Sequence, residues 1–99
     1  MRPIDLSKLR LFYEIAREGN LTRAAEKLNI SQPALSRILI MFENRLKTKL
    51  FERLSNGMRL TPDGERLYDH AKIILEAHDT FERQFFDREG EIAGEIKII

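Results

Sequence analysis

The sequence contains no cysteine, which excludes disulfide bonds, thiolate metal sites and a cysteine nucleophile. It also lacks long apolar runs: none approaches the ~20 residues of a membrane span, and the first ten residues, MRPIDLSKLR, lack the apolar segment of a signal peptide. We therefore expect a cytoplasmic protein with no membrane partner. Neither a phosphate-cradling glycine loop nor a serine–histidine–acid set is visible, so the sequence predicts no enzyme and no cofactor.

The two histidines offer little for a metal ion. His70 and His78 are eight residues apart, whereas a helical metal pair uses a spacing of four. A packing or hydrogen-bonding role for His78 is therefore favoured, and we predict no metal site. The acids Glu89 and Glu91 lie beside Gly90 and near Gly94, in a predicted hinge where solvation is favoured over acid–base chemistry.

Charge divides the chain into two parts. Ninety-nine residues, 42% of them hydrophobic, suit one small domain with an appendage. Residues 1–61 carry twelve basic and six acidic side chains, a net charge of +6, whereas residues 62–99 carry five and ten, a net charge of −5. A basic head on an acidic stalk indicates that the head meets a polyanion, although ordinary ion-paired helix surfaces also produce such a division.

The first predicted helix follows Asp5 or Ser7 and ends at Gly19, which tolerates a left-handed backbone. Its apolar stripe recurs every three or four residues and consists of Leu6, Leu9, Phe12, Ile15 and Ala16.

Residues 21–40, LTRAAEKLNISQPALSRILI, predict two short helices joined by a tight turn. Thr22 is the expected cap of the first, which ends near Leu28, and Ser31 caps the second with Pro33 in its first turn. Small residues at Ala24 and Ala25 let the two helices cross closely. This is the pattern of a helix-turn-helix, whose second helix lies in the DNA major groove.

The second of these helices, residues 32–46, has two different sides. The expected core side consists of Leu35, Ile38, Leu39, Phe42 and Leu46. The other side consists of Pro33, Ser36, Arg37, Ile40 and Asn44. Glutamine suits adenine, arginine grips guanine, and Pro33 or Ala34 can touch a thymine methyl, so Gln32 and Arg37 are candidate base readers. The alternative is an ordinary solvated face; an outward Ile40 also needs a contact, whether a sugar, a methyl group or another subunit.

Residues 50–60, LFERLSNGMRL, predict a β-hairpin that turns at Ser55, Asn56 and Gly57. Arg53 and Arg59 flank its tip, so the hairpin can reach DNA backbone or minor groove as a wing. A purely structural hairpin that closes the helical core is the alternative, and both roles can coexist.

A long helix begins after Thr61, with Pro62 at its first position and Gly64 where a capping box has glutamate. A heptad seam follows, made of Leu67, Ala71, Ile74, His78, Phe81 and Phe85. A helix of ~25 residues spans ~37 Å, too long for the head to cover, so dimerisation is favoured over packing back onto the head. Residues 95–99, EIKII, predict one β-strand with no partner in this chain.

The chain closely resembles the LysR-type bacterial transcriptional regulators over about residues 4–96. The matching positions include Leu6, Leu9, Phe12, Thr22, Arg23, Ala24, Ala25, Leu28, Ser31, Gln32, Pro33, Ala34, Leu35, Ser36, Arg37, Glu43, Leu46, Leu50, Phe51, Arg53, Leu60, Thr61 and Gly64. The resemblance implies a mainly α winged helix-turn-helix, residues 4–61, and a linker helix, residues 62–88, that pairs antiparallel in a homodimer. Residues 89–99 would be a hinge and the first strand of an effector domain that the chain lacks.

By the same resemblance, each DNA-binding residue has an expected role. The base-edge residues would be Gln32, Pro33, Ser36 and Arg37. The phosphate-binding residues would be Thr22, Arg23 and Ser31, with Arg53 and the tip residues Ser55 and Asn56 acting as the wing. Lys47 departs from the family pattern, in which glycine is usual, and Ile40 and Met41 replace residues that are commonly polar.

The sequence thus predicts a transcription regulator that binds an inverted-repeat operator in double-stranded DNA as a dimer, with no small-molecule site in this chain. Higher oligomers are expected only with an effector domain. The rival is a protein-interaction module whose linker helix pairs with a full-length regulator.

Overall fold

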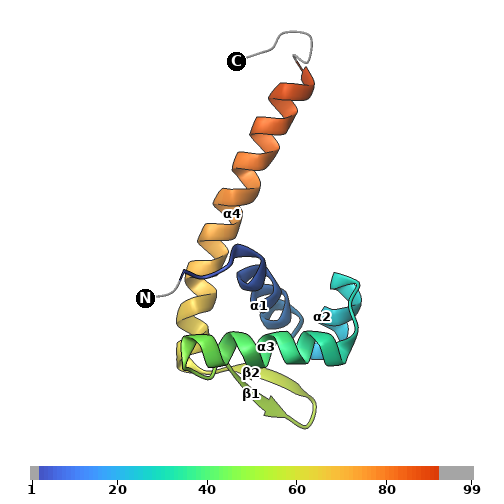
Figure 1. The fold of residues 1–99 in the computed structure, drawn as a ribbon, viewed down its shortest axis with the longest axis vertical. Helices are drawn as coiled ribbons and strands as arrows, with labels where there is room; N and C mark the ends of the chain where they lie inside the picture. Colours follow the sequence, from blue (N-terminus) through green and yellow to red (C-terminus); the bar gives the residue numbers. More distant parts are fainter. Residues whose placement is uncertain (1–2, 92–99) are drawn as a thin grey trace.

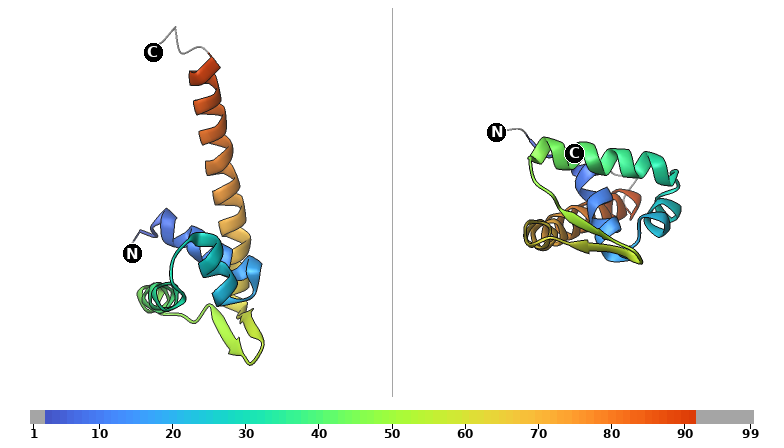
Figure 2. Two further views of the ribbon diagram at one scale, coloured as in Figure 1. Left: turned by 90° about the vertical axis from the view of Figure 1, so that its right-hand side faces the viewer. Right: turned by 90° about the horizontal axis from the view of Figure 1, so that it is seen from below.

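A computed structural model describes residues 3–91 as four α-helices and one antiparallel pair of strands. Their order is α1 (Leu6–Glu18), α2 (Leu21–Leu28), α3 (Gln32–Leu46), β1 (Phe51–Leu54), β2 (Gly57–Leu60) and α4 (Pro62–Glu91). Figure 1 shows α1, α2, α3 and the hairpin gathered into a head, from which α4 leaves as a long stalk. The views in Figure 2 show the hairpin projecting from the end of the head opposite the stalk.

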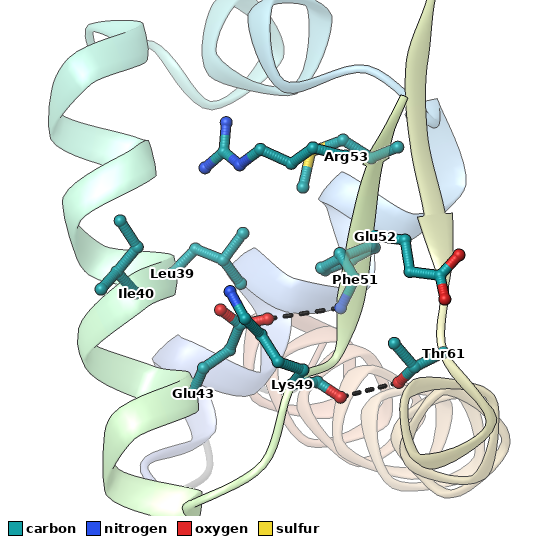
Figure 3. A pocket seen from close by; sticks show the side chains of 9 residues that line it. Leu39, Ile40, Glu43, Lys49, Phe51, Glu52, Arg53 and Thr61 are labelled. Carbon is teal, nitrogen blue, oxygen red and sulfur yellow. Dashed lines mark hydrogen bonds between the residues drawn. The ribbon is translucent and has the colours of Figure 1, made fainter. Parts of the chain in front are cut away.

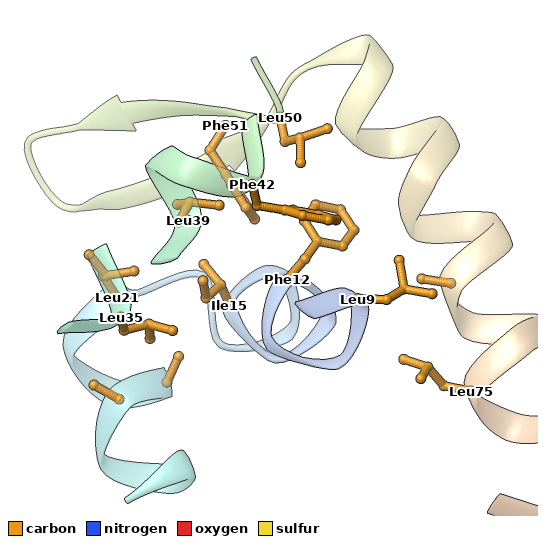
Figure 4. Close-up of a cluster of buried hydrophobic side chains, with 13 residues drawn as sticks. Leu9, Phe12, Ile15, Leu21, Leu35, Leu39, Phe42, Leu50, Phe51 and Leu75 are labelled. Carbon is orange, nitrogen blue, oxygen red and sulfur yellow. The ribbon is translucent and has the colours of Figure 1, made fainter. Parts of the chain in front are cut away.

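The head is built around α1, whose apolar stripe supplies Leu9, Phe12 and Ile15 to the core. The Phe12 ring lies 6.4 Å from that of Phe42 in α3 and 5.4 Å from that of Phe51 in β1, measured between centroids (Figure 4). All five other elements therefore pack on or beside one central helix. The fully or nearly buried apolar residues are Leu9, Phe12, Ile15, Leu21, Ala24, Ala25, Leu35, Leu39, Phe42, Leu50, Phe51, Ala71 and Leu75.

Three of the predicted helix caps are confirmed. The Asp5 carboxylate accepts a hydrogen bond from the Ser7 amide at 2.9 Å, and the Ser31 hydroxyl accepts one from the Ala34 amide at 3.2 Å. The Thr61 hydroxyl accepts one from the Gly64 amide at 3.0 Å. Each bond satisfies a donor that has no partner within its own helix.

The predicted cap of α2 is wrong by two residues. Asn20, not Thr22, precedes the helix, and its side-chain oxygen accepts a hydrogen bond from the Arg23 amide at 2.9 Å. This start places Leu21 inside the helix, where it is buried. Thr22 therefore lies in the first turn with its side chain exposed.

At Gly64 and Lys47 the sequence departs from the expected pattern, and the structure shows how each residue fits. At Gly64, a Cβ atom would overlap the carbonyl oxygen of Leu50, so the position has no room for the glutamate of a capping box. Lys47 ends α3 with a φ of 59°, the left-handed conformation that glycine adopts most easily. The helix thus ends as it would at a glycine, at a backbone cost of about 1–2 kcal/mol.

The hairpin matches its prediction closely. β1 and β2 are antiparallel, with Phe51 opposite Leu60 and Leu54 opposite Gly57, so Ser55 and Asn56 form the turn. The amide of Met58 donates to the carbonyl of Gly19 at 3.1 Å, which ties the second strand to the end of α1.

A buried carboxylate joins α3 to the hairpin. Glu43 is only 7% exposed, and its Oε2 accepts hydrogen bonds from the amides of Leu50 at 2.8 Å and Phe51 at 3.3 Å. Nearby, the Thr61 hydroxyl donates to the carbonyl of Lys49 at 2.7 Å. The end of α3, the start of β1 and the start of α4 are thereby fixed to one another.

The first half of α4 packs against α1. Ala71 and Leu75 are buried there, the rings of Tyr13 and Tyr68 stack with centroids 5.0 Å apart, and Arg10 pairs with Asp79 at 2.7 Å. Residues of the predicted heptad seam therefore differ in their surroundings: some pack against the head and others are exposed. Ala71 has no exposed surface left for a second chain, so it packs onto the head instead. Leu67 is partly buried against the same core.

The second half of α4 projects beyond the head. Phe81 and Phe85 there are 62% and 49% exposed, and Ile74, which lies before the buried Leu75, is 45% exposed. The helix continues through Glu91, so the hinge expected around Gly90 is wrong: three further residues extend the linker predicted to end at 88. Gly94 and the predicted strand 95–99 lie outside the described residues. No helix within residues 3–91 combines the length and apolarity needed to cross a membrane.

We predict that Glu43→Ala lowers the free energy of unfolding by about 2–4 kcal/mol, because two buried amides lose their acceptor. Glu43→Gln, which keeps one carbonyl oxygen as an acceptor, should lower the free energy of unfolding by a smaller amount. Urea denaturation followed by circular dichroism measures both. Glu26→Ala, at an exposed position of α2, is the control and should stay within about 0.5 kcal/mol of the parent chain. Equal stability of the Glu43→Ala chain and the control would contradict this role.

Candidate nucleic-acid interface

The outward side of α3 is a continuous stripe. Pro33, Arg37, Ile40 and Asn44 are all exposed and follow one another at intervals of four, three and four residues, so they lie above one another along the helix. The opposite side is buried in the core through Leu35, Leu39 and Phe42. Rigid packing of one side therefore fixes the direction of the other.

The first turn of α3 combines a positive helix end with small polar groups. Ser31 uses its oxygen as the cap, which leaves its hydroxyl proton available to a further acceptor. Gln32 and Ala34 are half-buried, whereas Pro33 is exposed. Such a helix start favours an anionic group in front of it.

Two further candidates lie at the start of α2. Thr22 and Arg23 are exposed in its first turn, directly after the Asn20 cap. Figure 1 shows α2 beside the N-terminal end of α3, so the two helices border the same region of the head.

The two arginines of the hairpin have different surroundings. Arg53 Nη2 donates to the Ser36 hydroxyl oxygen at 3.1 Å, so it reaches from β1 onto α3. Arg59 lies opposite Glu52 and pairs with it at 2.6 Å. Because neighbouring strand residues face opposite ways, Arg53 and Arg59 lie on different sides of the hairpin. The structure thus joins Arg53 to α3 and does not join Arg59 to it. Ser55 and Asn56 are exposed at the tip.

An open groove of about 520 Å³ separates α3 from the hairpin. In Figure 3, Ile40 borders it on the helix side, and Lys49 and Arg53 come from the hairpin side. The carboxylate of Glu43 is directed to the Phe51 amide, so it contributes little charge to the surface.

Several cations on α2, on α3 and beside the groove have no acidic partner within residues 3–91. Across the part of the chain that the structure describes, Arg23, Arg37, Lys49 and Arg53 form no ion pair. The ion pairs found there involve Arg10, Arg17, Lys27, Arg59 and Arg66, together with His78. Arg37 on the outward stripe, and Lys49 and Arg53 at the groove, are therefore available to an external anion.

Two acids of α4 have lowered pKa values. Hydrogen bonds from Thr48 and Arg66 lower the pKa of Asp63 at the start of the helix. A hydrogen bond from Arg10 lowers the pKa of Asp79 and stabilises the contact between α1 and α4. Both shifts favour the charged carboxylate, as an ion pair requires.

Three potential metal ligands meet on α4. Donor atoms of His78, Asp79 and Glu82 lie within 4.8 Å of one another. However, Asp79 is already bound by Arg10, and the two imidazole nitrogens face Asp79 at 3.6 Å and Glu82 at 3.5 Å. These contacts hold the three side chains together on one face of α4, and Arg10 occupies one of the two carboxylates.

Residues 6–65 match the sequence model described as "Bacterial regulatory helix-turn-helix protein, lysR family". The chain belongs to the LysR family. Among its relatives, the uncharacterised HTH-type transcriptional regulator YdcI of Escherichia coli (strain K12) is 44% identical over 87 residues, covering 88% of this chain and 28% of YdcI. The HTH-type transcriptional regulator BudR of Klebsiella aerogenes is 45% identical over 76 residues, covering 77% of this chain and 53% of BudR. The chain thus spans only part of these relatives.

Solved structures share the LysR fold seen here. The DNA-binding domain of BenM in complex with catB site 1 DNA superposes with a TM-score of 0.78 at 34% identity, covering 95% of this chain and all of that one. Oxidised OxyR of Corynebacterium glutamicum gives a TM-score of 0.80 at 39% identity, covering 91% of this chain and 27% of that one. The winged helix-turn-helix with a long C-terminal helix is therefore the fold of this LysR-type chain.

Sequence reasoning missed the contacts that hold this surface together. The Asn20 cap, the anchoring of the hairpin by Glu43 and the bond between Arg53 and Ser36 were not predicted. Asn20 was recognisable as a capping residue, because asparagine ranks at least as high as threonine. The other two contacts join residues that are far apart along the chain, and no local pattern reveals them.

Proposed function

We propose that this chain is the DNA-binding part of a LysR-type transcription regulator and reads duplex DNA through α3 and the hairpin wing. The observation that carries this proposal is the outward stripe of α3 beside unpaired Arg37 and Arg53. The BenM complex supports it, since a similar domain was solved with DNA. The similarity to transcriptional regulators favours this role over an enzymatic one.

The proposal assigns the candidate residues to base edges, to phosphates or to the wing. Base edges in the major groove meet α3, where arginine suits guanine and glutamine suits adenine. The residues assigned there are Gln32, Pro33, Ala34, Ser36 and Arg37. The phosphate ligands are Thr22, Arg23 and Ser31, and the wing supplies Arg53, Ser55 and Asn56. Arg59 has a smaller part, because Glu52 already neutralises it.

The same proposal includes a homodimer formed by the distal half of α4. The exposed Phe81 and Phe85 rings lie 5.8 Å apart, Phe86 packs against Phe85 at 5.4 Å, and Ile74 continues the stripe towards the head. Water-exposed aromatic clusters of this kind favour burial against another surface. Two paired stalks would present two recognition helices to an inverted repeat.

Salt dependence tests the DNA-binding proposal. If a dimer neutralises about 6–10 phosphates, the logarithm of its association constant should fall against the logarithm of salt concentration with a slope of about −5 to −9. Fluorescence anisotropy with a labelled duplex measures it. A flat response, or no binding to any duplex, would favour the rival role of a protein-interaction module that only pairs with a full-length regulator.

Replacing Arg37 by alanine should weaken binding to the preferred site by about 1–3 kcal/mol and relax base choice at one position. The reason is that a bidentate contact to guanine would be lost. Competition between the preferred duplex and its single-base variants measures both effects. Arg83→Ala, which removes the same charge from the distal stalk, is the control and should bind like the parent. An equal loss on all sequences would assign Arg37 to phosphate alone.

Replacing Phe81 and Phe85 together by alanine should raise the dissociation constant of the dimer at least thirtyfold, since the loss of even one buried aromatic anchor costs about 2 kcal/mol or more. Sedimentation equilibrium measures this constant. Arg83→Ala serves again as the control on the same stretch of helix. A parent chain that stays monomeric at all concentrations, or a double variant that dimerises unchanged, would refute the proposed interface.

A further inference from the structure

Ile40 is an apolar residue in the middle of a polar surface. Its side chain is 46% exposed, and it follows Arg37 by three residues on the outward stripe of α3. The core takes Leu39 and Phe42 from the same part of the helix, so Ile40 is held outward by its neighbours. An exposed β-branched side chain loses little rotamer freedom on binding, because its χ1 angle is already restricted.

The charges around Ile40 limit what can cover it. Arg37 lies one turn away, while Lys49 and Arg53 lie across the groove that Ile40 borders (Figure 3). None of these three cations makes an ion pair among the described side chains. An apolar protein partner would bury these charges without compensation, which is costly. A surface with anions at its edge and an apolar group at its centre fits better.

The DNA major groove has this composition. Phosphates border it, and the C5-methyl of thymine is the apolar group that a base presents there. Isoleucine has neither a donor nor an acceptor, so it can distinguish bases only by such apolar contact. A larger apolar residue nearby, Met41, is 62% exposed but lies about 100° further around the helix, away from the stripe.

We propose that Ile40 is a specificity-determining residue that selects thymine by packing on its methyl group. This inference rests on the proposed function, in which α3 lies in the major groove. Ile40 is seven residues, or about 10.5 Å, along the helix from Pro33. The selected thymine therefore belongs to a different base pair from the one met by the first turn of α3.

The test replaces thymine by deoxyuridine, which removes only the methyl group. The purified chain first selects a duplex from a random library, and each thymine of that duplex is then exchanged singly. Loss of one methyl contact, about 0.8 kcal/mol, corresponds to about fourfold weaker binding. We expect this loss at one thymine per half-site with the parent chain, and none at that position with Ile40→Ala.

Met41→Ala is the matched control and should keep the fourfold penalty. A parent chain that is indifferent to deoxyuridine at every thymine would overturn the inference. So would an Ile40→Ala chain with an undiminished penalty, since Pro33 or Ala34 would then contact the methyl. In both cases tight, salt-dependent DNA binding would persist, so the proposed function would stand. A chain that enriches no duplex would refute both proposals.

Discussion

The outward surface of the head depends on the buried carboxylate of Glu43. A carboxylate removed from water costs several kcal/mol unless it is well hydrogen-bonded, and here two backbone amides at the start of β1 provide that compensation. The bonds fix the start of β1 against α3. From there Arg53 lies within hydrogen-bonding distance of Ser36, while the strand register places Arg59 on the other side of the hairpin.

Local sequence signals predicted most of this fold because they act over a few residues. Ser31 and Thr61 cap their helices, and the Asn-Gly turn joins two short strands, as their patterns indicate. At the start of α2, two suitable caps lie two residues apart, and the burial of Leu21, a tertiary effect, decides between them. The spacing of Ala71 shows that it faces another helix, but spacing alone cannot distinguish α1 of the same chain from a second copy.

In the candidate interface, too, local sequence predicts some features, whereas others depend on contacts between distant residues. The stripe on α3 follows from helical periodicity, and the structure places Pro33 and Arg37 outward as predicted. The different surroundings of Arg53 and Arg59 depend on strand register, which one residue of slip would reverse. The division of charge was visible in the sequence, whereas the pairing of individual cations, such as Arg10 with Asp79, required the folded arrangement.

The unbroken path of α4 has a mechanical consequence. Its 30 residues are about 45 Å long, and its first half is fixed to α1 by stacked tyrosines and an ion pair. For a rigid helix of this length, a tilt of about 5° about one end would move the other end by about 4 Å, close to the rise of one base pair. In a paired assembly, slight changes in the angle between two such helices would alter the separation of the heads by whole base pairs.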